Sequence, residues 1–402
     1  MPEKLVLAMV GLPARGKSTM ARKIAQAFQM DGLRVRVFNN GELRRRLTGP
    51  ETSHPDFFSP TNLQGVKLRE KLAIINLELA KGYLQESGDV AIVDAANVTK
   101  SRRKMIQEFF QGTVVLFLEC VNSDREVLEA NLARKAALKE FQSLPATEAM
   151  ESFRSRISHY ESIYEPLAEE KNRLVVDSFE CSILQEEFAQ EVPYYERLRD
   201  VILTRYVNHL YLVRHGETIF NLQDRIGGDP ELTLRGWQQA EELANHFKSQ
   251  RIPLIFTSSR KRTRQTAVPV ARSQKDCTII ALPEFDEINS GVCEEMTYKE
   301  IRERFPHVAE ARRKDKYGYV YPGGEGYATM EARIERGLRK VFYLSRPEDS
   351  IMIVGHRAVN RMILSHFVFR RKEEVPYIYM PQDGYYHIVV TANTKLFELK
   401  RF

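Results

Sequence analysis

The sequence lacks the features that mark a secreted or membrane protein. It holds four cysteines in 402 residues, and none of them forms a C-x-x-C pair. Cysteines used this sparingly are typical of free thiols in a reducing compartment. No apolar run approaches the 18 residues that cross a membrane, and no apolar signal-peptide run precedes the first expected strand. We therefore expect a cytoplasmic protein with no membrane partner.

A large excess of charge of one sign is also missing. The chain has 60 lysines and arginines against 54 aspartates and glutamates, a formal net charge of +6. Recognition of nucleic acid usually needs a concentrated basic face, so this mild excess predicts no nucleic-acid partner and is compatible with small anionic substrates. The content of 43% hydrophobic and 28% charged residues is that of an ordinary globular protein.

Short apolar runs that alternate with helical periodicity indicate the fold class. In the first half, expected strands cover residues 5–10, 35–38, 90–93, 114–118 and 174–176, and expected helices include 19–30 and 68–87. In the second half, expected strands cover residues 210–213, 254–257, 279–282, 351–354 and 386–391. Buried parallel strands form continuous apolar runs, and helices cross over between them. We predict an α/β protein of two domains, residues 1–205 and 206–402, joined around residues 186–208. Each is expected to be a mostly parallel sheet with helices on both faces.

The first half carries a phosphate-binding loop after its first expected strand. The run GLPARGKS matches G-x-x-x-x-G-K-[S/T] and consists of Gly11, Leu12, Pro13, Ala14, Arg15, Gly16, Lys17 and Ser18. Its glycines let backbone N–H groups close around phosphate oxygens at the positive end of the following helix. Lys17 would contact the β- and γ-phosphates, and the Ser18 hydroxyl would ligate Mg²⁺. The motif predicts an enzyme that takes a phosphoryl group from a nucleotide.

An acid and a group of arginines follow the neighbouring strands. Asp94 ends the run VAIVD, where its carboxylate would help to hold the metal, although an aspartate there could instead cap the next helix. Guanidinium groups bind phosphates through two parallel hydrogen bonds, so clustered arginines suit a phosphorylated acceptor. Taken singly, each arginine is more often a solvated surface charge. The candidates are Arg44, Arg45, Arg69, Arg102, Arg103 and Arg156.

The second half carries two histidines that each follow an apolar run. LVRHGET contains Arg214 and His215, and VGHRAVNR contains His356. The R-H-G run at a strand end resembles the histidine phosphatase superfamily, in which a neutral imidazole attacks phosphorus and arginines neutralise the phosphoryl oxygens. Arg262 would share that task, and Glu287 is a candidate acid for the leaving oxygen. A serine hydrolase is disfavoured because G-x-S-x-G is absent, and a metal hydrolase because H-E-x-x-H is absent.

Longer stretches of the first half resemble the kinase half of the 6-phosphofructo-2-kinase/fructose-2,6-bisphosphatase family. They are FNNGELRR, FFSPTN, VDAANVT and SRISHYESIYEPL. The resemblance implies a kinase that phosphorylates the 2-hydroxyl of fructose 6-phosphate with ATP and Mg²⁺, with the nucleotide on the phosphate loop and near Asn131. Two departures are present: Ala96 replaces a threonine that contacts substrate in the family, and the lysine near the nucleotide is out of register, with Lys135 and Lys139 as candidates. The resemblance places fructose 6-phosphate against Arg44, Arg69, Arg102, Arg156 and Tyr160.

The second half resembles the phosphatase half of the same family more closely. RIGGDPELTLRG, EINSGVCEEMTYKEI and KYGYVYPGGEGY carry that likeness. It implies a phosphoglycerate mutase-like domain after a P-loop NTPase-like one, hydrolysis of fructose 2,6-bisphosphate through a phosphohistidine, and a homodimer. The family has H-Q-A-V-M-R where this chain has H-R-A-V-N-R, so Arg357 is an added cation. The residues implied to contact the bisphosphate are Arg214, Asn221, Gly227, Tyr298, Arg312, Lys316, Tyr327, Arg357 and Arg361, with its 6-phosphate on Arg312, Lys316 and Arg361.

Two other functions remain open from the sequence. A polynucleotide kinase–phosphatase also pairs a phosphate loop with a phosphatase, although the phosphatase of such enzymes is not normally of the R-H-G type and this chain lacks a basic stripe. The second is a phosphatase whose kinase half senses nucleotide without turnover, which the Ala96 departure would allow. ATP and fructose 6-phosphate in a coupled assay would separate these functions.

Overall fold

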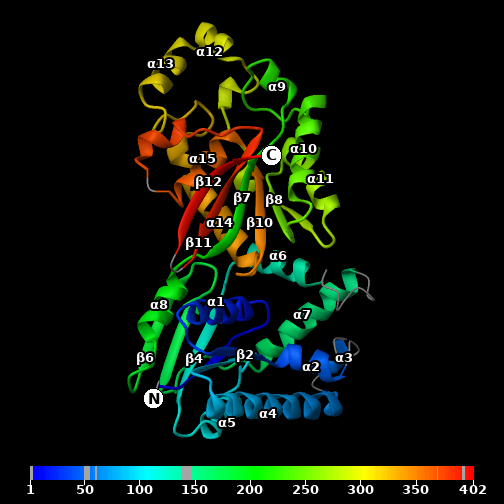
Figure 1. Cartoon of the computed structure of the whole chain (residues 1–402), viewed down its shortest axis with the longest axis vertical. Helices are drawn as coiled ribbons and strands as arrows, with labels where there is room; N and C mark the ends of the chain where they lie inside the picture. The colour runs from blue at the N-terminus through cyan, green and yellow to red at the C-terminus, as the bar shows by residue number, and fades with distance from the viewer. Residues whose placement is uncertain (1–2, 49–54, 59–60, 137–145, 369, 392–393) are drawn as a thin grey trace. The chain divides into compact units, whose positions relative to one another are not determined.

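The computed structural model describes residues 3–48, 55–58, 61–136, 146–368, 370–391 and 394–402. Contacts between Cα atoms divide the chain into two compact units, Met1–Arg205 and Tyr206–Phe402. The chain colours run from blue to green through the first unit and from green to red through the second (Figure 1). Each unit has its own six-stranded sheet and its own hydrophobic core.

The sheet of the first unit is parallel except at one edge. Its strands follow the order β2-β3-β1-β4-β5-β6, and β6 pairs antiparallel with β5. Because β1 and β3 are parallel neighbours, the loop after β1 and Asp94 at the end of β3 lie at the same edge of the sheet. The bounds are β1 (Leu5–Val10), β2 (Val35–Asn39), β3 (Val90–Asp94), β4 (Val114–Val121), β5 (Asn172–Asp177) and β6 (Ser182–Phe188).

Helices cover both faces of this sheet. One core contains Val6 and Ala8 of β1 together with Leu77 of α4 (Leu63–Glu86) and Ile106 of α5 (Lys100–Phe109). The opposite face of β1 is equally buried, and α1 (Lys17–Met30) and α8 (Tyr195–Leu203) contact each other on that side (Figure 1). The prediction of a mostly parallel sheet with helices on both faces is confirmed. The other helices of this unit are α2 (Asn40–Thr48), α3 (Pro55–Phe58), α6 (Arg125–Ala136) and α7 (Ala146–Ser162).

The segment expected to be a junction is largely regular structure of the first unit. Residues Ser182–Phe188 form the antiparallel edge strand β6, and Tyr195–Leu203 form α8. The sequence SILQEEF lacks an apolar run because the middle of this edge strand is exposed. α8 buries Leu198, Val201 and Ile202, a spacing of three and four residues that indicates one buried helix face.

The sheet of the second unit mixes four parallel strands with two antiparallel ones. Its order is β12-β11-β7-β10-β8-β9, with β7, β10, β8 and β9 parallel. β11 pairs antiparallel with β7, and β12 pairs antiparallel with β11. β12 was not expected, because its residues are mostly exposed and form no apolar run. The bounds are β7 (Val207–Arg214), β8 (Leu254–Thr257), β9 (Thr278–Ala281), β10 (Ser350–Gly355), β11 (Gly384–Val390) and β12 (Lys395–Arg401).

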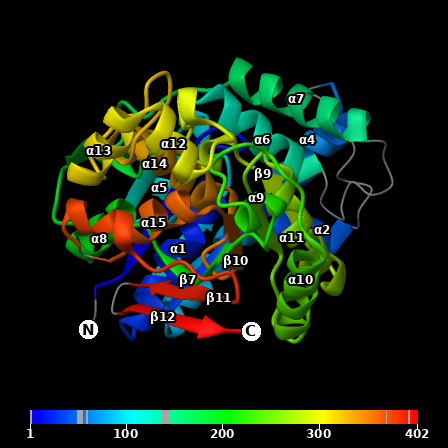
Figure 2. The same cartoon turned by 90° about the horizontal axis from the view of Figure 1, so that it is seen from above.

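Helices pack on both faces of this second sheet as well. α10 (Leu234–Phe247) and α11 (Lys261–Ser273) lie side by side in both views and share a core with β7 and β10 (Figures 1 and 2). α14 (Tyr327–Leu344) and α15 (Arg357–Ser365) contact each other, and α15 also contacts β7. Because β7, β10 and β8 are parallel neighbours, the residues that follow all three strands meet at one edge. The shorter elements are α9 (Ile219–Leu222), α12 (Tyr298–Arg304), α13 (Pro306–Lys314), η3 (Pro283–Phe285), η4 (Gly291–Cys293) and η5 (Lys372–Tyr377).

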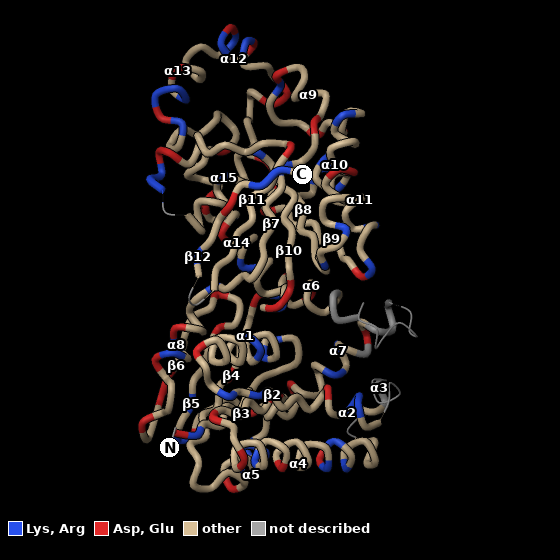
Figure 3. Tube along the Cα trace, in the orientation of Figure 1, with Lys and Arg blue, Asp and Glu red and all other residues tan. Residues whose placement is uncertain are grey.

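Charges of both signs are spread along the two units. Lysines and arginines are interspersed with aspartates and glutamates along the trace, as on α13 and α4 (Figure 3). Within the described part of the chain, no helix combines the length and the apolar character needed to cross a membrane.

Candidate active sites

The phosphate loop between β1 and α1 depends on its two glycines. Gly11 has φ +130°, and a Cβ there would lie 2.5 Å from the carbonyl oxygen of Cys120. Gly16, directly before α1, has φ +81°, a value that other residues rarely adopt. These backbone angles bring the loop around the N-terminus of α1, where unpaired N–H groups and the helix dipole favour an anion.

Lys17 and Asp94 are both buried beside this loop. The ammonium group of Lys17 donates to the carbonyl oxygen of Leu12 at 2.6 Å. Burial lowers the pKa of Lys17 to about 8, and the nearby charge of Asp94 opposes that shift. Asp94 in turn accepts a hydrogen bond from the Asn39 amide. A cation and a carboxylate therefore lie beside the loop, close enough for the carboxylate charge to affect the pKa of the lysine.

Asn131 supports the loop from within the fold. Its amide donates to the carbonyl oxygen of Ala14 at 2.9 Å, and its own side-chain oxygen is buried without a hydrogen-bond partner among the described residues. The residues described contain no cluster of three histidine, cysteine or acidic side chains able to hold a metal ion. Mg²⁺ in nucleotide sites takes one or two protein oxygens and completes its shell with phosphates and water. Ser18 and Asp94 fit that mode of binding.

Three of the predicted arginines gather around the phenylalanines of α3. The guanidinium carbons lie 5.0 Å (Arg44), 5.7 Å (Arg69) and 4.0 Å (Arg156) from the centroid of the Phe58 ring. Arg69 also donates to the carbonyl oxygen of Phe57. Packing on an aromatic face orients a guanidinium group and leaves its N–H edge able to bind an anion. The fold thus brings together residues that are more than 100 positions apart in the sequence.

Arg102 and Tyr160 belong to the same cluster. Burial lowers the pKa of both Arg69 and Arg102. Tyr160 lies close enough to each of them to oppose that shift in pKa. Nη1 of Arg102 and Nε of Arg156 are buried without hydrogen-bond partners among the described residues. Buried donors are costly unless a partner completes them, so these two atoms point to an anionic ligand. All five residues implied to contact fructose 6-phosphate therefore lie in one cationic cluster.

Arg103 does not belong to this cluster, which corrects one of the candidates. It is fully buried, forms an ion pair with Glu170, and donates to the carbonyl oxygens of Glu165 at 2.9 Å and Pro166 at 3.3 Å. Its charge is used within the fold, and sequence spacing alone could not distinguish it from its neighbour Arg102. Arg45 is exposed on α2. The side chains of Lys135 and Lys139 lie outside the described residues.

His215 follows β7 and is fixed by its own backbone. Its Nδ1 lies 2.8 Å from the carbonyl oxygen of Gly216. A carbonyl only accepts, so Nδ1 carries the proton and Nε2 keeps its lone pair. Burial, with Arg262 and Arg214 nearby, lowers the pKa of His215 well below its usual value. The imidazole is thus held neutral with one nitrogen free to act as a nucleophile.

His356 follows β10, and its ring centroid lies 5.3 Å from that of His215. His356 Nε2 is 2.8 Å from Ser258 Oγ, which is 2.9 Å from Thr263 Oγ1. Thr263 gives its single hydroxyl proton to the carbonyl oxygen of Arg260 at 2.8 Å. Ser258 must therefore donate to Thr263, and the Nε2–H of His356 must donate to Ser258. This order leaves Nδ1 of His356 unprotonated, buried and without a partner among the described residues.

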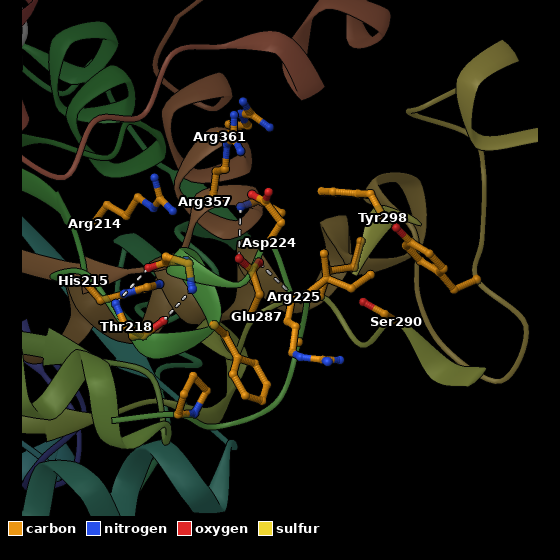
Figure 4. Close-up of a pocket in the computed structure, with 18 of the residues that line it drawn as sticks. Arg214, His215, Thr218, Asp224, Arg225, Glu287, Ser290, Tyr298, Arg357 and Arg361 are labelled. Atoms are coloured by element: carbon orange, nitrogen blue, oxygen red, sulfur yellow. Dashed lines mark hydrogen bonds between the residues drawn. The ribbon is translucent and has the colours of Figure 1, made fainter. Parts of the chain in front are cut away.

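Two arginines flank His215. Arg214 donates to the carbonyl oxygen of Met380 at 3.2 Å, and burial followed by the charge of Arg357 lowers its pKa to about 10. Arg262 donates to the carbonyl oxygen of Gly228 at 2.8 Å. In Figure 4, Arg214 and His215 extend into the same space, with Glu287 beside them. Preplaced donors of this kind stabilise charge that develops on phosphoryl oxygens.

His215 opens into a cavity of about 370 Å³. A second group of cations lines this cavity: burial lowers the pKa of Lys316 to about 8, and Arg312, Arg361 and Arg357 lower it further. Arg361 also donates to the Tyr327 hydroxyl at 3.2 Å. The cavity thus contains two groups of cations. One group lowers the pKa of His215, and the other lowers the pKa of Lys316. Every residue implied to contact the bisphosphate lines it: Arg214, Asn221, Gly227, Tyr298, Arg312, Lys316, Tyr327, Arg357 and Arg361.

Glu287 also lines this cavity. Its carboxylate accepts a hydrogen bond from the Ala358 amide at 3.4 Å, and its charge acts on both Arg214 and Arg262. An acid between the two arginines and the cavity is in position to exchange a proton with a bound phosphoester.

Gly227 and Asn221 shape the wall on the other side of the cavity. Gly227 has φ +71°, a backbone conformation that other residues rarely adopt, and a Cβ there would lie 1.9 Å from a carboxylate oxygen of Glu294. The side-chain oxygen of Asn221 accepts from the Thr218 amide at 3.0 Å and from Gln382 at 3.0 Å. Both residues therefore order the loop that follows His215.

Three further residues of the site were not expected from the sequence. Ser258 directly follows β8, a position that could have indicated it, and Thr263 lies in the first turn of α11. Gln382 donates to the carbonyl oxygen of His215 at 3.2 Å, but it lies in a loop before β11 with no motif around it. Its role depends on long-range packing, which leaves no local signal.

Comparison with known proteins gives the class of each unit. Residues 1–199 match the 6-phosphofructo-2-kinase family, and residues 210–401 match the histidine phosphatase superfamily (branch 1). The chain therefore joins a kinase domain to a histidine phosphatase domain.

Relatives of known name match almost the whole chain. It is 35% identical over 390 residues to "6-phosphofructo-2-kinase/fructose-2,6-bisphosphatase 4" of Rattus norvegicus, covering 94% of this chain and 80% of the relative. It is 34% identical over 392 residues to "6-phosphofructo-2-kinase/fructose-2,6-bisphosphatase 3" of Homo sapiens, covering 94% and 72%. A solved structure of the alpha-ribazole phosphatase from Shigella flexneri matches 48% of this chain and 96% of its own at 22% identity, with a TM-score of 0.45. The chain belongs to the 6-phosphofructo-2-kinase/fructose-2,6-bisphosphatase family.

Proposed function

We propose that this chain both makes and hydrolyses fructose 2,6-bisphosphate. The observation that carries the proposal is the pair of cation groups in the phosphatase cavity. Arg214 and Arg262 lie beside His215, and Lys316 lies among Arg312, Arg357 and Arg361. A substrate with one phosphate would leave one group without an anion, whereas a bisphosphate occupies both.

In the kinase unit, fructose 6-phosphate is the acceptor. Its 6-phosphate binds the cluster of Arg44, Arg69, Arg102 and Arg156 with Tyr160, and its 2-hydroxyl faces the phosphate loop. When bound, MgATP supplies the γ-phosphoryl group and a divalent charge that neutralises it. Lys17 and the loop amides would hold the β- and γ-phosphates, and Ser18 and Asp94 would hold the metal. This placement is supported by buried donors of Arg102 and Arg156 that have no hydrogen-bond partner among the described residues.

In the phosphatase unit, Nε2 of His215 attacks the phosphorus of the 2-phosphate. The bond from phosphorus to the sugar oxygen breaks, and the carboxyl group of Glu287, protonated in the substrate complex, gives that oxygen its proton and becomes a carboxylate. Water then attacks the phosphohistidine, Glu287 accepts a proton from the water, and the bond from phosphorus to Nε2 breaks to release phosphate. Arg214 and Arg262 stabilise the phosphoryl oxygens during both steps, and His356 joins them once its unprotonated Nδ1 takes up a proton beside the bound phosphate dianion.

Glu287→Gln is expected to slow formation of the phosphohistidine about 100-fold, because glutamine keeps the shape but has no acidic proton to give. A rapid-quench single-turnover experiment with fructose 2,6-bisphosphate measures this rate. Glu303→Gln is the matched control, since Glu303 is an exposed residue that lies near Lys299 on α12. A Glu287→Gln rate equal to that of the control would remove Glu287 from the role of acid.

Ser258→Ala is expected to slow the same step about ten-fold. Loss of the serine leaves the buried Nε2–H of His356 without an acceptor, a penalty of roughly 1–3 kcal/mol, and frees the ring to change tautomer. The dependence of the rate on pH should also change, because the Nε2–H of His356 loses the acceptor that stabilises the protonated ring. Ser259→Ala is the control: the Ser259 hydroxyl donates to Asp286 at 2.7 Å and does not touch His356. Equal effects of the two substitutions would contradict the role of the hydrogen bond from His356 to Ser258 in this step.

A coupled assay tests the proposed function against the alternatives. With ATP and fructose 6-phosphate, the purified chain should form ADP and an acid-labile sugar phosphate. ADP formation only with a polynucleotide would instead support a polynucleotide kinase–phosphatase. Nucleotide binding without turnover on fructose 6-phosphate would support a sensing role for the kinase unit.

We further propose that the chain works in the cytoplasm as a homodimer. The support for the dimer is membership of the family. Sedimentation of the purified chain at increasing concentration tests it, and a monomer throughout would contradict it.

A further inference from the structure

The phosphatase unit has a second hollow next to the cavity that contains His215. This hollow also measures about 370 Å³. Arg214, Arg357 and Gln382 line both spaces, so they form the wall between them. The residues that line only the second hollow are Arg235, Gln239, Tyr379, Met380, Pro381 and Asp383.

Three arginines and one carboxylate line this hollow, so its lining carries a net positive charge. Among the residues described, neither Arg235 nor Arg357 forms an ion pair, and both side chains are exposed. Asp383 is the carboxylate of the hollow, and it is paired with Arg401. Arg214 donates to a backbone carbonyl, and its Nε is buried without a described partner. The hollow thus offers unused guanidinium donors on more than one side.

Two of these arginines lie at the N-termini of helices, which are themselves positive. Arg235 lies in the first turn of α10, and Arg357 is the first residue of α15. Helix N-termini are positive and disfavour cations. An anion in the hollow would offset the repulsion between these side chains and their own helix ends.

We propose that this hollow binds orthophosphate, and that it receives the phosphate released at His215. Orthophosphate is a small dianion whose tetrahedral oxygens match guanidinium donors. Arg214 and Arg357 face both spaces, so a phosphate on either side of this wall contacts a cation, and the proposed route for the released phosphate runs past these two side chains. The second half of this proposal depends on the proposed phosphatase function, whereas the binding of phosphate does not.

Isothermal titration of the full chain with orthophosphate tests the site. Arg235→Gln removes a cation that lines only the second hollow, and we expect it to weaken one class of phosphate sites about ten-fold. Arg235→Lys keeps the charge and should retain most of the affinity. Arg251→Gln is the control, because Arg251 is an exposed arginine of the same unit, 3.7 Å from Asp349. Phosphate binding at the phosphate loop is common to all variants and cancels in the comparison.

Product inhibition tests the passage of phosphate. In the unmodified chain, orthophosphate should inhibit bisphosphate hydrolysis with a non-competitive component, which Arg235→Gln should abolish while the single-turnover rate stays unchanged. Identical isotherms for Arg235→Gln and Arg251→Gln would overturn the site, even if the bisphosphatase activity is present. If Arg235→Gln removes one class of phosphate sites but the unmodified chain does not hydrolyse the bisphosphate, the phosphate site is supported and the proposed function is contradicted.

Discussion

His215→Ala is expected to reduce hydrolysis of fructose 2,6-bisphosphate by at least about 1,000-fold, because it removes the nucleophile and with it the covalent route. Synthesis of the bisphosphate should persist, since the kinase residues lie in the other unit. His246→Ala is the matched control: His246 belongs to the same unit but lies on α10, 3.0 Å from the Tyr385 hydroxyl. Both activities are measured by product formation with the purified variants.

The covalent intermediate can also be identified directly. Bisphosphate labelled at the 2-phosphate should transfer label to the peptide that contains His215, in a linkage that is stable to base and labile to acid. His356→Ala should slow the appearance of label without moving it. Label attached to His356 would exchange the roles of the two histidines, and an absence of label under rapid quenching would indicate direct attack by water.

Lys17→Ala is expected to reduce kinase activity by at least about 1,000-fold and to leave the phosphatase nearly unchanged. The ammonium group is the buried cation of the phosphate loop, and loss of one such preplaced donor typically costs about 100- to 1,000-fold even before ATP affinity falls. Lys104→Ala is the control, because Lys104 is an exposed residue of the same unit that lies 3.9 Å from Glu108. Loss of both activities in folded Lys17→Ala protein would contradict the independence of the two sites.

The same lysine predicts a dependence of ATP binding on pH. Burial lowers the pKa of Lys17 to about 8 in the free enzyme. Below this pKa the side chain is a cation that attracts phosphates, and above it the side chain is increasingly neutral. The KM for ATP should therefore rise as the pH increases through about 8. Lys17→Arg should remove that rise, because arginine stays charged throughout the range.

The strand runs and the two motifs carry most of what the sequence predicts correctly. β1, β8 and the other buried parallel strands are continuous apolar runs, and the structure places them within a few residues of their expected bounds. The motif residues follow strands that turn out to be neighbours, so the sheet order brings them together. The family resemblance, now supported by matches over both halves, carried the rest of the predicted functional class.

What the sequence missed depends on contacts between distant segments. The edge strands β6 and β12 are mostly exposed and so lack an apolar run. Arg102 and Arg103 are adjacent in sequence. Arg102 has a donor in the arginine cluster without a partner in the described part of the chain, whereas Arg103 is paired with Glu170. Gln382 reaches His215 from 167 positions away. Such contacts follow from the packed fold and have no local pattern that could have predicted them.

We propose that this one chain makes and destroys the same phosphoester at two independent sites. Incubation with fructose 6-phosphate and ATP labelled at the γ-phosphate tests it most directly. Label should pass from ATP to the sugar 2-position, then to His215, and finally to orthophosphate. His215→Ala should stop the sequence at labelled fructose 2,6-bisphosphate, and Lys17→Ala should leave all label in ATP. Label that reaches orthophosphate in Lys17→Ala, or that bypasses the bisphosphate in the unmodified chain, would contradict the account.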